Sequence, residues 1–212
     1  MIQEMADKIT WLRHASFRID TEKVIYIDPF KLSGGPEADI ILITHDHYDH
    51  CSPADIAKIR KEGTVIITEK SSAEKLAGDI RKIKVGESID VDGIKIKAVP
   101  AYNLNKKFHP ANNQWIGFLI TIDDVTIYHA GDSDYIPEMK NIDADIALLP
   151  VSGTYVMTAD EAVQAALNIN PEIAIPMHYD TLVGDIKDAE QFKNELAGKV
   201  KVTILNQTER DE

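Results

Sequence analysis

The chain has 212 residues, of which 44% are hydrophobic, and this suits one globular domain with a sizeable core. The formal net charge of −12 argues against a nucleic-acid backbone as partner, and the single cysteine excludes an intramolecular disulfide. No apolar run reaches the roughly 18 residues of a membrane span, and the N-terminus lacks a signal-peptide pattern, so we expect a soluble cytoplasmic protein.

The first part of the chain predicts strands that lead to one helix. Strands are expected at residues 8–14, 16–20 and 24–28, the last two forming a hairpin. The segment 39–44 is almost continuously apolar, which is typical of a strand covered on both faces. Ser52 and Pro53 then have the pattern of a helix start, and this helix should end near Gly63 before a buried strand at 64–68.

The middle of the chain predicts shorter elements. The sequence "SSAE" at 71–74 has capping-box spacing and predicts a short helix. Residues 80–99 read as short antiparallel strands, and residues 101–114 as an irregular polar loop.

The second half repeats the theme of the first. A hairpin is expected over 115–132, with Asp123 and Asp124 at its turn, and "GFLITIDDVTIYHAGD" resembles "SFRIDTEKVIYIDP". Buried strands at 145–150 and 172–179, helices after 158 and at 188–197, and a strand at 200–206 follow. Strands thus come in runs with helices between them, which favours an α+β domain of two sheets with outer helices.

The segment "THDHYDH" carries the strongest chemical signal. His45, His47, Asp49 and His50 follow a buried strand directly, and imidazoles and carboxylates are ligands for Zn²⁺, Fe or Mn. Single histidines are common in solvated loops, but three in six positions are not. The motif therefore predicts a metal site at a sheet edge.

This motif and several others resemble the metallo-β-lactamase superfamily. "WLRHASFRI", "YIDPF", "THDHYDH", "VPAYN", "IYHAGDSD", "DIALLPVSGTY" and "IPMHY" occur in the order seen in its ascorbate-6-phosphate lactonase-like branch. That branch also resembles the catalytic domain of N-acyl-phosphatidylethanolamine phospholipase D. The resemblance implies a single domain over residues 1–212 with a four-layer αββα sandwich fold and metals at one edge.

The resemblance also implies a ligand set. His45 and His47 would hold one metal, Asp49, His50 and His178 a second, and Asp132 both. One or two divalent ions would bind, Zn²⁺ foremost, with Mn²⁺, Ni²⁺ or Fe²⁺ as alternatives.

The remaining ligand of the first metal departs from the family pattern. Many relatives have a histidine where this chain has Asn103, and His109 lies six residues later. Either Asn103 ligates weakly or His109 reaches in from the loop. We favour His109, with a plain surface histidine as the alternative.

Several nearby residues have two interpretations. His14 is either a polar residue at a sheet rim or a proton donor near the metals, and Asp28 a carboxylate that orients a histidine. Asp49 could orient the nucleophile as well as ligate. Cys51 and His129 are expected to be structural.

Such a site implies a metal-dependent hydrolase in which a metal-bound hydroxide cleaves an ester, lactone or phosphodiester. The partner would be a small molecule, and Lys106 and Lys107 could attract an anionic one, although a solvated loop is the simpler interpretation. A small metal-dependent nuclease and a non-catalytic metal-binding protein are the alternatives. The sequence leaves a homo-oligomer open.

Overall fold

The computed structural model describes residues 1–209, which fold into two compact units with one mixed sheet each. The β1–β6 unit comprises Asp7–Ile83 and the segment from Leu205 onward. The β7–β13 unit comprises Met1–Ala6 and Lys84–Ile204. Among the described residues, no helix is long and apolar enough to cross a membrane.

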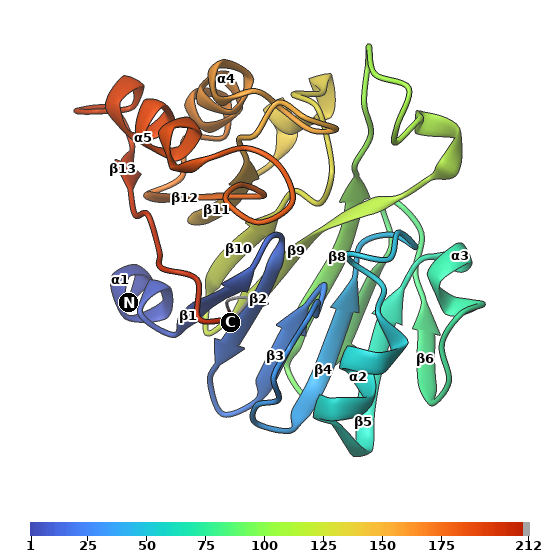
Figure 1. Cartoon of the computed structure of the whole chain (residues 1–212). Helices are drawn as coiled ribbons and strands as arrows, with labels where there is room; N and C mark the ends of the chain where they lie inside the picture. The colour runs from blue at the N-terminus through green and yellow to red at the C-terminus, as the bar shows by residue number, and fades with distance from the viewer. Residues whose placement is uncertain (210–212) are drawn as a thin grey trace. The chain divides into compact units, whose positions relative to one another are not determined.

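The first sheet has its strands in chain order and passes from antiparallel to parallel pairing (Figure 1). Pairing is antiparallel from β1 to β3 and parallel from β3 to β6. Its strands are β1 (Ile9–Arg13), β2 (Ser16–Asp20), β3 (Val24–Ile27), β4 (Ala38–Ile43), β5 (Arg60–Thr68) and β6 (Asp79–Lys82). The predicted β2–β3 hairpin is confirmed. The antiparallel prediction for the segment of β6 is wrong, because a helical crossover precedes it and lets it pair parallel to β5.

Two short helices accompany this sheet. α2 (Pro53–Ile59) starts as predicted, with Ser52 Oγ accepting from Asp55 N–H at 3.3 Å. It ends before Gly63 because the chain from Arg60 onward already belongs to β5. α3 (Lys70–Ala73) is capped by Glu69, whose carboxylate accepts from the backbone of Ser71 and Ser72. The predicted cap at Ser71 is therefore wrong.

Apolar side chains of α2 join the core of the β1–β6 unit. Ile56 and Ile59 pack in one cluster with Tyr26 of β3, Ile41 of β4 and Ile66 of β5. All five are at most 3% exposed, so α2 is held against the strands by burial of its apolar face.

The second sheet also passes from antiparallel to parallel pairing. Pairing is antiparallel from β7 to β10 and parallel from β10 to β13. Its strands are β7 (Ser88–Val91), β8 (Ile94–Pro100), β9 (Ile116–Ile122), β10 (Val125–His129), β11 (Ile146–Pro150), β12 (Ile173–Met177) and β13 (Lys201–Val202). The β9–β10 turn has Asp123 and Asp124 at φ of 49° and 62°, the left-handed conformation that a two-residue hairpin needs.

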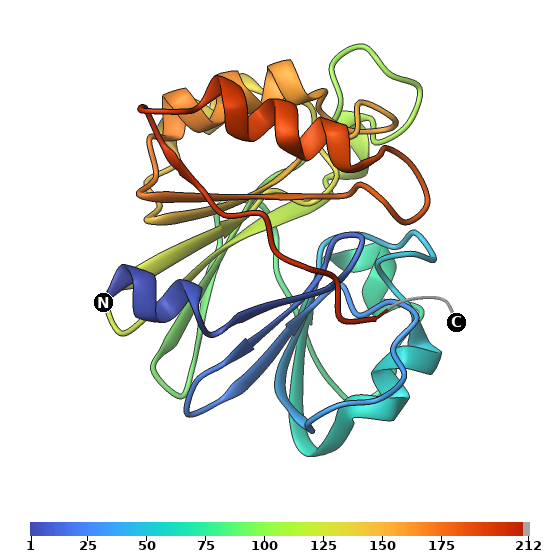
Figure 2. The ribbon, with the colours of Figure 1, turned by 60° about the vertical axis from the view of Figure 1, so that its left-hand side comes forward.

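Helices cover the parallel part of this sheet. Figure 2 shows α4 (Ala159–Ile169) and α5 (Ile186–Glu195) side by side, and they contact β11 and β12 respectively. The predicted capping box of Thr158 and Glu161 is present. The unit also contains α1 (Ile2–Ala6) and the 3₁₀ turns η1 (Ala111–Asn113) and η2 (Pro137–Asn141). β13 is shorter than the predicted strand at 200–206.

The two sheets share one order of pairing. In each, an antiparallel hairpin (β2–β3 or β9–β10) is followed by a strand parallel to its second member (β4 or β11). This shared order is the structural counterpart of the similarity between the two hairpin sequences.

Candidate metal-binding residues

In the β1–β6 unit, the residues of interest lie where parallel strands end. Asp28 follows β3, and Thr44 and His45 follow β4. These strands are parallel neighbours, so their carboxyl ends share one edge of the sheet. That topology brings together residues that are 16 positions apart in the sequence.

Asp28 and Thr44 orient two of the motif histidines. Asp28 accepts from the Thr44 hydroxyl at 2.6 Å and from His50 Nδ1 at 2.7 Å. The Thr44 hydroxyl donates to Asp28, so it accepts from His45 Nδ1 at 3.0 Å. Both imidazoles thus carry their proton on Nδ1 and present the lone pair of Nε2. This arrangement supports the orienting role predicted for Asp28, and it adds Thr44, the first residue of "THDHYDH", for which no role was predicted.

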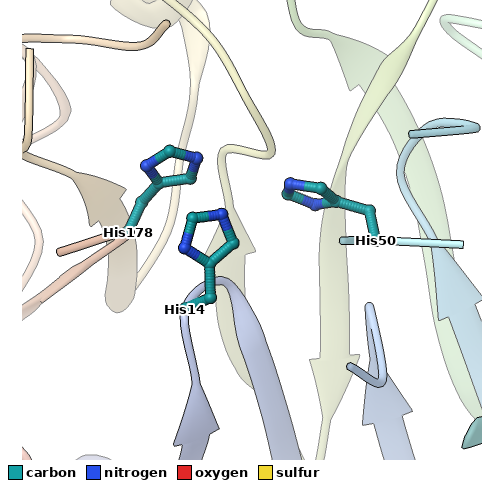
Figure 3. Close-up of side chains that lie close together, drawn as sticks. All are labelled: His14, His50 and His178. Carbon is teal, nitrogen blue, oxygen red and sulfur yellow. The ribbon is translucent and has the colours of Figure 1, made fainter. Parts of the chain in front are cut away.

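The five predicted site residues of this unit cluster. The His45 ring lies 4.6 Å from that of His47 and 4.1 Å from that of His50, between centroids. Asp49 Oδ2 lies 3.2 Å from His14 Nε2 and 3.8 Å from His50 Nε2. Figure 3 shows His14 in the β1–β2 turn and His50 in the segment after β4.

In the β7–β13 unit, three predicted residues converge on one carboxylate oxygen. Asp132 Oδ2 lies 3.3 Å from His109 Nε2 and 3.2 Å from His178 Nε2. All three side chains are at most 4% exposed. Asp132 follows β10, His178 follows β12 (Figure 3), and His109 comes from the loop after β8.

The proton positions in this cluster fit a bound cation. His109 Nδ1 lies 3.1 Å from the carbonyl of Tyr155, which can only accept, so Nδ1 carries the proton. In a neutral imidazole the lone pair of Nε2 then faces the carboxylate of Asp132. Two acceptors facing each other at 3.3 Å are stabilised by a cation that both can bind. The donor set of imidazole nitrogens and a carboxylate therefore fits a divalent metal.

Ser152 supports His178 in the same way. Its hydroxyl lies 3.1 Å from His178 Nδ1 and donates to the carbonyl of Thr154 at 3.5 Å, so it accepts from Nδ1. Gly184 lies against Ser152, and a Cβ on Gly184 would come within 2.6 Å of the Ser152 Cβ. Ser152 lies in the segment "DIALLPVSGTY", but no role was predicted for it, because that role depends on a three-dimensional contact.

Four residues of the two clusters also have an unusual backbone conformation. His14, Asp28, His109 and His178 have φ of 53°, 45°, 56° and 62°, a region that residues other than glycine rarely occupy. Such strained residues cluster at functional sites, where the surrounding contacts maintain them.

Cys51, His129 and Lys106 are held by burial or by local contacts, and none of them belongs to the predicted ligand set. Cys51 is 4% exposed, and burial raises the pKa of its thiol to about 11, with a hydrogen bond from Ser72 opposing the shift. His129 Nδ1 accepts from Gly131 N–H at 3.1 Å. Lys106 pairs with Asp134 and lies 3.8 Å from Glu161, so its charge is already compensated.

Comparisons with known proteins agree with these features. Residues 8–178 match the family model of the beta-lactamase superfamily domain. UPF0173 metal-dependent hydrolases of Methanopyrus kandleri and Thermoplasma acidophilum are 33% and 38% identical to this chain. Both alignments cover 93% of this chain, together with 96% and 94% of the respective relatives.

Solved structures show the same relationship. A candidate metal-dependent hydrolase from Parabacteroides distasonis is 37% identical with a TM-score of 0.84, over 94% of this chain and 93% of that one. A candidate zinc-dependent hydrolase of the metallo-β-lactamase superfamily from Thermotoga maritima is 25% identical with a TM-score of 0.65, over 93% and 97%. These matches confirm the predicted α+β class and metallo-β-lactamase fold. The chain therefore belongs to the metallo-β-lactamase superfamily and, within it, to the UPF0173 metal-dependent hydrolases.

Proposed function

We propose that this chain hydrolyses an ester, lactone or phosphodiester bond in a small molecule, as a lactonase-like branch of the superfamily would. The observation that carries the proposal is the convergence of His109 and His178 Nε2 on one oxygen of Asp132. Hydrogen bonds to both Nδ1 atoms leave Nε2 as the ligand atom, and this preparation serves metal binding.

We further propose that both units contribute to one hydrolase domain spanning residues 1–212. His45, His47 and His109 would hold one divalent ion, Asp49, His50 and His178 a second, and Asp132 would serve both. The support is the sequence resemblance, together with the donor chemistry that each unit shows by itself. Zn²⁺ is the first choice, because four-coordinate sites rich in imidazole suit it, and Mn²⁺, Ni²⁺ and Fe²⁺ also accept these donors.

Bound metal ions would supply Lewis acidity, which activates water near neutral pH and stabilises the negative charge that develops on the substrate. Asp49 would orient the nucleophile as well as ligate. His14, with Nε2 at 3.2 Å from Asp49, would carry the proton that the leaving group requires.

The substrate charge is a separate question. Because Asp134 and Glu161 compensate Lys106, the exposed Lys107 is the cation of this loop that remains for an anionic group. We propose that Lys107 contributes to binding when the substrate carries a phosphate. Replacing Lys107 by alanine should then raise KM for a phosphate-bearing lactone and leave KM for its uncharged counterpart unchanged.

The main test uses one ligand variant from each unit. The purified protein is loaded with Zn²⁺ or Mn²⁺, its metal content is measured by emission spectroscopy, and aryl esters, lactones and phosphodiesters are screened. His47→Ala and His109→Ala should each lose about one metal per chain. Hydrolysis should fall by more than the roughly 10- to 100-fold that loss of a supporting partner costs.

The matched control is His129→Asn, because asparagine keeps an acceptor for Gly131 N–H where His129 Nδ1 stood. It should retain metal and turnover. Equal turnover in the wild type and both ligand variants would refute the metal mechanism. Metal binding without turnover on any substrate would instead identify a non-catalytic metal-binding protein.

A further inference from the structure

Asn103 closes the loop that carries His109. Asn103 is 6% exposed, and its backbone N–H donates to the carbonyl of His109 at 2.7 Å. An isolated bridge also joins Asn103 to Pro110. The loop between residues 103 and 110 is therefore pinched at its base, with Asn103 and His109 as neighbours.

The side-chain amide of Asn103 makes a second set of contacts. Nδ2 donates to the carbonyl of Tyr155 at 2.6 Å and to the carbonyl of Phe108 at 3.0 Å. Nδ2 also lies 3.3 Å from His109 Nδ1, but the two carbonyls take both amide hydrogens, so this nitrogen is not an acceptor. Carbonyls only accept, so the amide must turn its nitrogen toward them. The amide thereby ties the loop of His109 to the loop that follows β11.

His109 uses the same acceptor as Asn103. The carbonyl of Tyr155 accepts from Asn103 Nδ2 and, at 3.1 Å, from His109 Nδ1. His109 and Tyr155 have φ of 56° and 69°, so these hydrogen bonds maintain two unfavourable backbone conformations. Without the amide, the carbonyl of Tyr155 would lose the shorter of these two hydrogen bonds and keep only the one from His109.

We propose that Asn103 is a positioning residue for His109: its amide places the Tyr155 carbonyl so that His109 is protonated on Nδ1 and offers Nε2 as the ligand atom. The inference rests on the proposed role of His109 as a ligand, but the proton position can be measured without metal. It also assigns Asn103 a role different from that of a metal ligand.

The competing role, Asn103 as a metal ligand through Oδ1, has a specific basis. Within residues 1–209, no group donates to this buried oxygen. The tautomer of the metal-free protein separates the two roles. Asn103→Ala and the nearly isosteric Asn103→Leu remove both the N–H donors and the oxygen. Loss of a positioning residue changes the His109 tautomer without metal, whereas loss of a metal ligand leaves it unchanged.

The experiment records long-range ¹H–¹⁵N spectra of the metal-free protein at about pH 8, where imidazoles with ordinary pKa values are neutral. In the wild type, His109 should show the Nδ1–H tautomer. His129 serves as an internal reference for the opposite tautomer, because its Nδ1 accepts from Gly131 N–H. Asn103→Ala and Asn103→Leu should shift His109 to a mixture or to the Nε2–H tautomer and leave His129 unchanged.

Metal titration provides the second readout. Zn²⁺ affinity should fall roughly 10- to 100-fold in both variants, the usual effect of losing a partner that orients a ligand. Asn168→Ala is the matched control, because this exposed amide also donates to a backbone carbonyl, that of Gln164 at 2.8 Å. It should change neither readout.

Thermal melting establishes that each variant is folded. If Asn103→Ala does not fold, Asn103→Gln decides, because it keeps the amide but displaces it by one methylene and should weaken the Nδ1–H preference. An unchanged His109 tautomer in the folded variants would overturn the proposal. Absence of hydrolysis by the wild type would count against the proposed function alone, because the tautomer is read without turnover.

Discussion

At the scale of single residues, the Asp28–Thr44 pair orients two of the motif histidines, although neither residue of the pair is a proposed metal ligand. One carboxylate orients His50 directly and His45 through the hydroxyl of Thr44. His50 therefore depends on one hydrogen bond to Asp28, whereas His45 depends on the hydroxyl of Thr44 as an intermediate. Removing the hydroxyl should disturb His45 and spare His50.

Thr44→Val tests this separation, because valine has nearly the same shape and lacks only the hydroxyl. We expect Zn²⁺ titration to show one class of site weakened roughly 10- to 100-fold and the other unchanged. The control is Thr68→Val, since Thr68 is equally buried but its hydroxyl donates to the carbonyl of Ile43 at 2.9 Å. Equal weakening of both classes would contradict the two-step orientation.

Cys51 gives a second prediction at this scale. With a thiol pKa of about 11, only about 0.1% of Cys51 is thiolate at about pH 8, against roughly a quarter for an ordinary thiol. Alkylation by iodoacetamide, followed by mass spectrometry, should be at least about 100-fold slower in the folded protein than in denaturant. A rate within tenfold of the denatured rate would show that Cys51 is reactive and accessible.

The residues of the site were predicted unevenly. His45, His47, Asp49 and His50 stand in one short segment whose spacing is itself a signal. Thr44, Ser152 and the Tyr155 carbonyl have no such signal, because single hydroxyls and backbone groups occur everywhere in a sequence. Only the fold shows which of them meets an imidazole nitrogen.

At the scale of elements, α2 is important for more than packing. Asp55 in its first turn accepts from the backbone N–H groups of Lys31 and Leu32 at 2.8 and 2.9 Å. It also accepts from Ser52 Oγ and Lys58 Nζ at 2.6 and 2.8 Å. This one carboxylate attaches the segment after Asp28 to the helix that follows the histidine motif.

Asp55 should make stability depend on pH. Burial raises the pKa of its carboxyl, but the hydrogen bonds from Lys58, Ser52 and the backbone outweigh burial and lower it below the usual value. A lowered pKa in the folded state stabilises the protein above the unfolded value of about 3.9, and this stabilisation is lost as the pH falls through the folded value.

Asp55→Asn should therefore lower the melting temperature near neutral pH and reduce the loss of melting temperature on acidification. Calorimetry at about pH 6 and about pH 3 measures both effects. Asp124→Asn, in the exposed β9–β10 turn, is the control and should follow the wild type. A variant whose melting temperature falls with acid as steeply as that of the wild type would exclude Asp55 as a source of the pH dependence.

Element types were easier to predict than their limits and partners. Apolar runs and caps located both hairpins, α4 and the buried strands, because burial and local hydrogen bonds decide these features. The end of α2 and the direction of β6 depend on pairing with β4 and β5, which local sequence does not encode.

At the scale of the whole molecule, each unit carries only some of the proposed ligands. The β1–β6 unit holds His45, His47, Asp49 and His50, and the β7–β13 unit holds the other three. If metal binds only the folded chain, it must stabilise the folded state. The free energy gained is about 2.7 kcal/mol at a metal concentration 100 times the Kd.

Addition of Zn²⁺ to metal-free protein should therefore raise the melting temperature, and excess EDTA should reverse the rise. His50→Ala, from one unit, and His178→Ala, from the other, should each reduce the shift by more than half. Differential scanning fluorimetry checks this, with His129→Asn as the control. A full shift in His178→Ala would mean that His178 is not a metal ligand.

The sequence predicted two related β-rich halves but not their boundaries along the chain. The β1–β6 unit is closed by residues from the end of the chain: Thr208 N–H and Glu209 N–H donate to the carbonyls of Trp11 and Leu12 at 3.1 and 2.9 Å. During synthesis on a ribosome, the edge of β1 must therefore wait until residues 208 and 209 have emerged. An unpaired strand edge attracts other strands, so the nascent protein is most open to aggregation in this interval.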